Sequence, residues 1–257
     1  MSSNGTQEHW HRRLLEGKSA LFAIVTTVGI SIGGIAEIIP MYTVAAGPEV
    51  IAEVTPYTQL ELAGRDIYVR EGCYNCHSQM VRPFRDETLR YNGPWSRAGE
   101  YAYDRPFQLG SRRIGPDLHR VGGKWPDAWH YEHMKDPRQT SPGSIMPPYP
   151  WLFDSKVDVA DIQASVSAMK TLGVPYTDDD VANTGKAMAE QAAGIVTNLK
   201  GSNIDAEPDL EIIALIAYLQ RLGVDGKKAL ASRDEAPPAS IAIDESGTTT
   251  ADSDGAQ

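Results

Sequence analysis

The sequence predicts a mainly α-helical protein with a single N-terminal transmembrane helix, followed by a helical domain with long loops. Residues 20–46 are almost all apolar or small, and Glu37 is their only charged residue. Several later stretches repeat apolar residues at helical spacing, and no stretch of useful length alternates as a strand does. Proline and glycine separate these stretches, which indicates loops between the helices.

Composition divides the chain into five segments. We expect a cytoplasmic N-terminus at residues 1–19, a transmembrane helix at 20–46, a linker at 47–59, an extracytoplasmic domain at 60–224 and an acidic disordered tail at 225–257. The tail has few large apolar residues, so burial cannot offset the entropy lost when it becomes ordered.

The first apolar stretch is long enough to cross a bilayer core of about 30 Å at a rise of about 1.5 Å per residue. Basic residues lie between positions 12 and 18, and none follows before Arg65, so the positive-inside rule places the N-terminus in the cytoplasm. The alternative is a cleaved signal peptide with its cleavage site at residues 44–46. The stretch is longer than a usual signal-peptide core, which favours a retained anchor.

Four helical patterns follow the linker. A capping box, in which residues 58 and 61 bond each other's backbone, opens a helix that runs toward Gly72. Apolar stripes predict helices over 158–172 and 177–199. A further stripe predicts a helix opened by residues 205–208 and stopped at Gly223.

The formal net charge of −10 is unevenly distributed. Residues 61–155 carry 13 basic and 12 acidic side chains, whereas residues 157–211 carry 10 acidic side chains and 3 lysines. This balance excludes nucleic acid as the expected partner, because nucleic-acid binding needs a basic surface.

The only two cysteines, Cys73 and Cys76, are followed directly by His77. This spacing is typical of c-type haem attachment, in which two thiols add to the vinyl groups of one porphyrin and the histidine binds the iron. The alternatives are a redox dithiol or half of a zinc site. A zinc site would need further ligands from the three histidines between 119 and 133, without a second cysteine pair.

The nature of the second axial ligand decides whether the iron transfers electrons or binds small molecules. Met146 lies in a proline-stiffened loop, residues 142–150, where neither helix nor strand is expected. We therefore predict Met146 as the distal ligand. Met134, which has His130 and His133 as neighbours, is the second candidate.

Residues 114–118, Ile-Gly-Pro-Asp-Leu, follow the attachment motif. The carbonyl of Pro116 is a candidate acceptor for the ring N–H of His77, a bond that would orient the imidazole and raise its basicity. The alternative is a Gly-Pro turn that does not contact the haem.

These motifs occur in the order found in class I cytochromes c: the Cys-Xaa-Xaa-Cys-His motif, the Gly-Pro-Asp-Leu-His turn, the Met-Pro loop and a terminal Ala-Leu-Ile-Ala-Tyr-Leu helix. More narrowly, residues 64–83, 110–113 and 142–147 resemble the membrane-anchored monohaem cytochrome c subunit, subunit II, of cbb3-type cytochrome c oxidases.

The resemblance implies that residues 60–224 form a class I cytochrome c domain with extra helices, holding one covalently attached haem c. It implies thioether bonds at Cys73 and Cys76, axial ligands at His77 and Met146, and Pro116 behind the histidine. It also implies that residues 64 and 68 pack against the last helix near residue 218.

By the same resemblance the chain relays electrons to an integral-membrane haem–copper subunit in aerobic respiration and has no catalytic centre of its own. The donor would be a dihaem cytochrome c subunit or a soluble cytochrome c, and the haem domain would lie in the periplasm at the bacterial inner membrane. The alternatives are a membrane-tethered carrier, a cytochrome subunit of nitric oxide reductase, and a peroxidase-like enzyme with an open haem. The short linker at 47–59 argues against a flexible tether.

Overall fold

The computed structural model describes residues 9–43, 51–91 and 93–235. The chain forms two compact units, Met1–Glu49 and Val50–Gln257. In the first unit, a helical turn η1 (Arg12–Glu16) precedes helix α1 (Ser19–Thr43). Residues Ser19–Ile39 of α1 form an apolar helix with no buried residues, 21 residues long, or about 31 Å. This helix fits a single membrane pass, as the sequence predicted.

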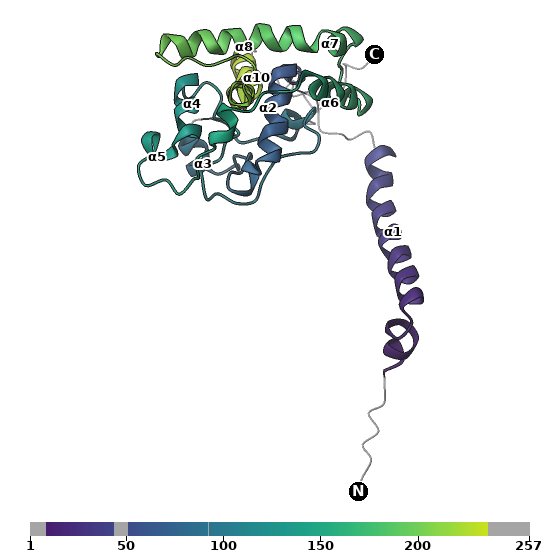
Figure 1. The fold of residues 1–257 in the computed structure, drawn as a ribbon. Helices are drawn as coiled ribbons and strands as arrows, with labels where there is room; N and C mark the ends of the chain where they lie inside the picture. Colours follow the sequence, from purple (N-terminus) through teal and green to yellow (C-terminus); the bar gives the residue numbers. More distant parts are fainter. Residues whose placement is uncertain (1–8, 44–50, 92, 236–257) are drawn as a thin grey trace, which may run out of the picture. The chain divides into compact units, whose positions relative to one another are not determined.

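The second unit is helical, and no strand occurs among the described residues of the chain. One isolated bridge joins Lys156 and Leu210. Its helices, shown in Figure 1, are α2 (Gln59–Arg70), η2 (Cys73–Asn75), α3 (Arg85–Arg90), η3 (Ala98–Tyr101), α4 (Asp127–Lys135), α5 (Pro137–Thr140), η4 (Pro150–Phe153), α6 (Val159–Thr171), α7 (Asp178–Ala182), α8 (Thr184–Gly201), α9 (Glu211–Arg221) and α10 (Val224–Glu235).

The centre of this unit is the crossing of α2 and α9. The expected capping box is present, since the Thr58 hydroxyl accepts from the Glu61 backbone and Glu61 accepts from the Thr58 backbone. Gly64 lets the two helices meet, because a Cβ there would lie 1.9 Å from the Ala214 carbonyl oxygen. The rings of Tyr68 and Tyr218 pack at 5.3 Å. The predicted contact between these helices is therefore confirmed.

Three helices flank this pair. The predicted helix over 158–172 is confirmed as α6, whereas the one over 177–199 is divided into α7 and α8. The Thr184 hydroxyl donates to the carbonyls of Asp180 and Val181, which is the local side-chain competition that interrupts helices. In Figure 1, α8 runs along the unit from α7 toward α4. The predicted last helix begins later than expected, at Glu211.

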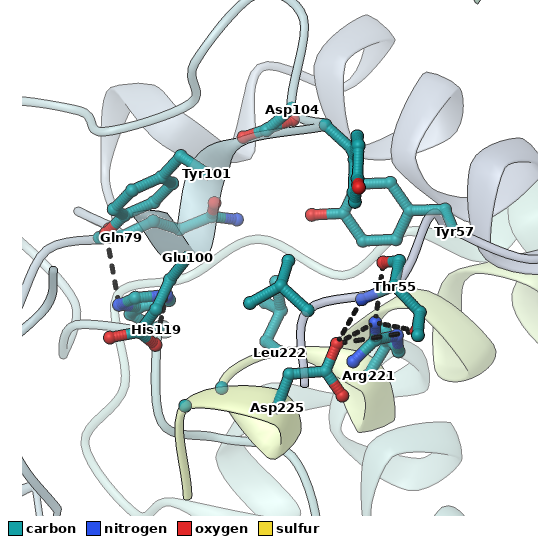
Figure 2. Close-up of a pocket in the computed structure, with 14 residues that line it drawn as sticks. Thr55, Tyr57, Gln79, Glu100, Tyr101, Asp104, His119, Arg221, Leu222 and Asp225 are labelled. Carbon is teal, nitrogen blue, oxygen red and sulfur yellow. Dashed lines mark hydrogen bonds and ion pairs between the residues drawn. The ribbon is translucent and has the colours of Figure 1, made fainter. Parts of the chain in front are cut away.

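The expectation of a disordered tail from residue 225 was wrong for its first part, since α10 continues to Glu235. Asp225 anchors this helix, because its carboxylate accepts from the Thr55 backbone N–H at 3.0 Å and pairs with Arg221 (Figure 2). Ala229 is 3% exposed. Thr55 lies 170 residues away from Asp225 in sequence, so local composition did not reveal this anchor. Residues 236–257 lie outside the described residues.

Candidate functional site

Helix α2 leads directly into the segment that carries the two cysteines. The helix ends at Arg70, and Gly72, with a positive φ of 69° and an N–H that donates to the Val69 carbonyl, redirects the chain into the turn η2. Cys73 opens this turn and is half-buried, while Cys76 is exposed. Burial raises the pKa of the Cys73 thiol to about 12, an environment that favours an uncharged sulfur such as a thiol or a thioether.

His77 is oriented by the loop that sequence analysis singled out. Its Nδ1 lies 2.8 Å from the carbonyl oxygen of Pro116, so Nδ1 carries the proton and donates, which leaves the Nε2 lone pair free for a metal. Gly115 packs directly beneath the ring, where a Cβ would come within 2.1 Å of His77 Cε1. Burial lowers the pKa of His77 and favours the neutral imidazole. The predicted contact between His77 and Pro116 is present.

The buried carboxylate of Asp117 ties this loop to the segment after the motif. It accepts from the Ser78 hydroxyl at 2.6 Å, from the Met80 backbone N–H at 2.7 Å and from the His119 backbone N–H at 2.9 Å. Asp117 belongs to the predicted Gly-Pro-Asp-Leu turn, but the sequence alone indicated no role for its side chain. Hydrogen bonds to a charged acceptor are among the stronger ones, so this carboxylate holds the histidine's two neighbouring segments together.

Gln79 connects the same segment to the helical core. Its side-chain amide donates to the Tyr218 hydroxyl at 3.0 Å, and its backbone carbonyl accepts from the Tyr101 hydroxyl at 2.5 Å. The side chain is buried with 1% exposure. No pattern in the sequence marked this residue, because its partners come from distant segments.

One cavity of about 660 Å³ brings the predicted site residues together. Cys73, Cys76, His77, Pro116 and Met146 all line it. Most of the remaining lining is aromatic or aliphatic and includes the following side chains, most of them from α2, α4 and α9: Tyr68, Trp125, Trp129, Met134, Leu215 and Leu219. Met146 is half-buried and packs against the hydrophobic core, so its loop turns the methionine inward.

Helix α4 carries Met134, the second predicted candidate for the distal position, and its neighbours His130 and His133. Met134 is 9% exposed and belongs to the core, and His130 is 2% exposed with an Nε2 that neither solvent nor a hydrogen-bond partner reaches. His133 is half-buried and stacks on Trp129. All three also line the cavity, so the structure brings Met134 and its two neighbouring histidines to the same cavity as Met146.

A second, polar cavity lies away from these donors. Figure 2 shows it between the side chains of Glu100, Tyr101 and His119 on one side and those of Thr55 and Asp225 on the other. Its volume is about 40 Å³, room for only a few water molecules, since one water needs about 10–15 Å³. It therefore cannot hold a large cofactor.

The larger cavity fits a haem. Its volume lies within the range of about 300–1,000 Å³ that is usual for cofactor sites, and its lining is mostly apolar with a few placed polar groups. The free Nε2 of His77 and the thioether of Met146 are the donor types that hold iron in electron-transfer haems. The absent side chain at Gly115 is what lets the histidine ring lie in this orientation.

A comparison with protein-family models agrees with this reading of the site. Residues 11–225 match the family described as cytochrome c oxidase, mono-heme subunit/FixO. No curated protein matches the chain.

Proposed function

The chain belongs to the FixO family, the monohaem cytochrome c subunits of cbb3-type oxidases, and we propose that it relays electrons through one haem attached covalently at Cys73 and Cys76. His77 and Met146 are the proposed axial ligands. The observation that carries this proposal is the single cavity lined by both cysteines, the histidine and the methionine. The family does not favour the tethered carrier or the nitric oxide reductase subunit as alternatives.

The haem supplies a one-electron couple when bound, and the protein sets its ligands and surroundings. The Pro116 carbonyl accepts a hydrogen bond from Nδ1–H of His77, which makes the imidazole more basic and leaves Nε2 as the nitrogen that would bind a haem iron. The neutral sulfur of Met146 favours the reduced state and thus a high reduction potential. Apolar side chains of α4 and α9 line the cavity and would limit the contact of a bound haem with water, so less solvent would rearrange when the haem charge changes.

The proposed electron acceptor is the integral-membrane haem–copper subunit of the oxidase. The family shows that the chain is part of a membrane-anchored oxidase complex. The proposed donor is the dihaem subunit or a soluble cytochrome c. Because basic residues precede α1 and none follows before Arg65, we propose a cytoplasmic N-terminus and a periplasmic haem domain at the bacterial inner membrane.

Spectroscopy of the purified haem-loaded protein tests the ligand assignment. Met146→Ala should abolish the sulfur-to-iron charge-transfer band of the ferric form, whereas Met134→Ala should retain it, because Met134 packs in the core. A band that survives Met146→Ala contradicts the assignment.

Denaturing gels stained for haem test the attachment. Wild-type protein should keep its haem under denaturing conditions, and the Cys73→Ser/Cys76→Ser variant should lose it.

Co-purification with a haem–copper subunit in mild detergent tests whether the chain is a subunit of the oxidase complex. Recovery of the chain alone, with the oxidase intact elsewhere, would contradict it.

A further inference from the structure

A second nitrogen donor lies in the same cavity as Met146 and is not used by the proposed function. His133, on α4, lines the cavity together with His77 and Met146. Burial lowers the pKa of His133, which favours the neutral imidazole.

Aromatic stacking helps to set the orientation of the His133 ring. It stacks on Trp129 with ring centroids 4.6 Å apart and an interplanar angle of 10°. Trp129 stacks in turn on Trp125, at 4.9 Å and 15°. The imidazole is thus the last of three nearly parallel rings along the cavity wall.

Hydrogen bonds also select the tautomer. His133 Nδ1 lies 2.5 Å from the Thr140 hydroxyl oxygen, and the same hydroxyl lies 3.3 Å from the Pro137 carbonyl oxygen. A carbonyl can only accept, so both contacts are satisfied when the hydroxyl donates to Pro137 and accepts from Nδ1–H. The lone pair then resides on Nε2. No hydrogen bond or ion pair engages Nε2 within the part of the chain that the structure describes.

This pattern matches that of a metal-binding histidine, in which one ring nitrogen donates to an oxygen and the other is free to bind. His130 does not share it, because its Nε2 is enclosed by protein. The Met134 side chain packs in the hydrophobic core, and its backbone carbonyl accepts a hydrogen bond from the Tyr149 N–H at 2.9 Å.

We propose that His133 is a reserve axial ligand, whose Nε2 binds the haem iron whenever the sulfur of Met146 leaves it. The proposal rests on the proposed function, because it assumes a haem held by His77 in this cavity. His133 lies on α4, whereas Met146 lies in the segment between α5 and η4, so two separate parts of the chain supply the two donors. The iron would then have no open coordination position in either state, which prevents oxygen or other small ligands from binding at this haem.

The full-length, haem-loaded protein with Met146→Ala tests the proposal. Electron paramagnetic resonance and near-infrared magnetic circular dichroism of the ferric form should show a low-spin iron with two nitrogen ligands. The Met146→Ala/His133→Gln variant should lose this signature, become high-spin and bind carbon monoxide when reduced. The matched control is Met146→Ala/His130→Gln, which removes the neighbouring histidine of α4 and should keep the two-nitrogen signature.

A high-spin Met146→Ala protein would overturn the proposal, and so would a two-nitrogen signature that persists after His133→Gln. The single variant His133→Gln is the control for folding. It should retain the sulfur-to-iron band, because Met146 still binds the iron in this variant. Thr140→Val is a second variant that keeps the histidine but removes its tether. In the Met146→Ala background it should weaken the two-nitrogen signature and increase carbon monoxide binding. The wild-type sulfur band reports on Met146 alone, so failure of the proposed function is distinguishable from failure of the reserve ligand.

Discussion

Replacing Gly64 with alanine tests whether the crossing of α2 and α9 supports the fold. The new Cβ would lie 1.9 Å from the Ala214 carbonyl oxygen and 2.7 Å from Tyr218 Cβ, whereas real Cβ contacts essentially never fall below 3.0 Å. One obstacle is backbone, so a side-chain rotation cannot relieve it and the two helices must separate. Their separation loosens α9, whose residues from Ile212 to Leu219 are at most 3% exposed.

The expected change in the free energy of unfolding of Gly64→Ala is the sum of two opposing effects. Overpacking of a well-packed core costs about 1–3 kcal/mol, and a backbone clash belongs at the upper end of that range. Alanine in place of glycine inside a helix returns about 1 kcal/mol. The net loss in the free energy of unfolding is therefore about 2 kcal/mol, which corresponds to a fall in Tm of about 4–8 °C for a domain of this size.

Thermal and urea unfolding of the haem-loaded protein, followed by circular dichroism, measure this loss. Gly194→Ala is the matched control, because Gly194 is an exposed residue inside α8 and no atom lies within 4 Å of the position that its Cβ would take. It should raise the free energy of unfolding by about 0.5–1 kcal/mol. If both variants shift stability in the same direction, close packing at Gly64 is not what requires a glycine.

Two other outcomes are expected from the surroundings of the site. Gly115→Ala should push the His77 ring away from Pro116. The bond that is lost is worth about 1 kcal/mol and favours the ferric state, so the haem reduction potential should rise, by at most about 40 mV, in a spectroelectrochemical titration; an unchanged potential would count against the packing argument. Burial, and next the charge of Arg120, lowers the pKa of His119 from 6.5 to about 3. The fold thus favours the neutral ring, so its contribution to stability is complete above pH 6.5 and is lost as the pH falls toward 3, at about 1.4 kcal/mol per pH unit. Urea unfolding at a series of pH values should show this loss, and His119→Gln should flatten it between about pH 6.5 and 4; a slope that His119→Gln leaves unchanged would assign the loss to other groups.

The parts of the fold that local sequence determines were predictable. The capping box at Thr58 predicted the start of α2, because Thr58 and its partner Glu61 lie three residues apart. Helix α10 was missed because its anchor, Asp225, bonds Thr55, 170 residues away. Helix α3 was missed for a similar reason: its buried Glu87 accepts from Arg113, which lies in the loop beneath the histidine.

In the site, too, local motifs were predictable from the sequence and contacts between distant segments were not. The spacing of Cys73, Cys76 and His77 indicated the chemistry, since that motif is local. The way in which the site is held together was not visible, because the supporting contacts of Gln79 and Asp117 join segments that are separate in sequence. The sequence also indicated Met134 as an alternative donor, but the neighbour with the free nitrogen is His133, and only the positions of Trp129 and Thr140 distinguish it.

The helix crossing and the cofactor cavity depend on each other. Leu215 and Leu219 of α9 and Tyr68 of α2 belong to the core and also line the cavity, so the surfaces that join these helices continue into the cofactor site. Gln79 links the segment after His77 to Tyr218, on α9 opposite Gly64. A change that separates α2 from α9 should therefore alter the haem spectrum as well as stability. Gly64→Ala should broaden or weaken the sulfur-to-iron band, whereas Gly194→Ala should leave it unchanged, since α8 contributes no residue to the cavity lining among the residues that the structure describes. A normal band in a destabilised Gly64→Ala protein would show that the cavity is held by its loops alone.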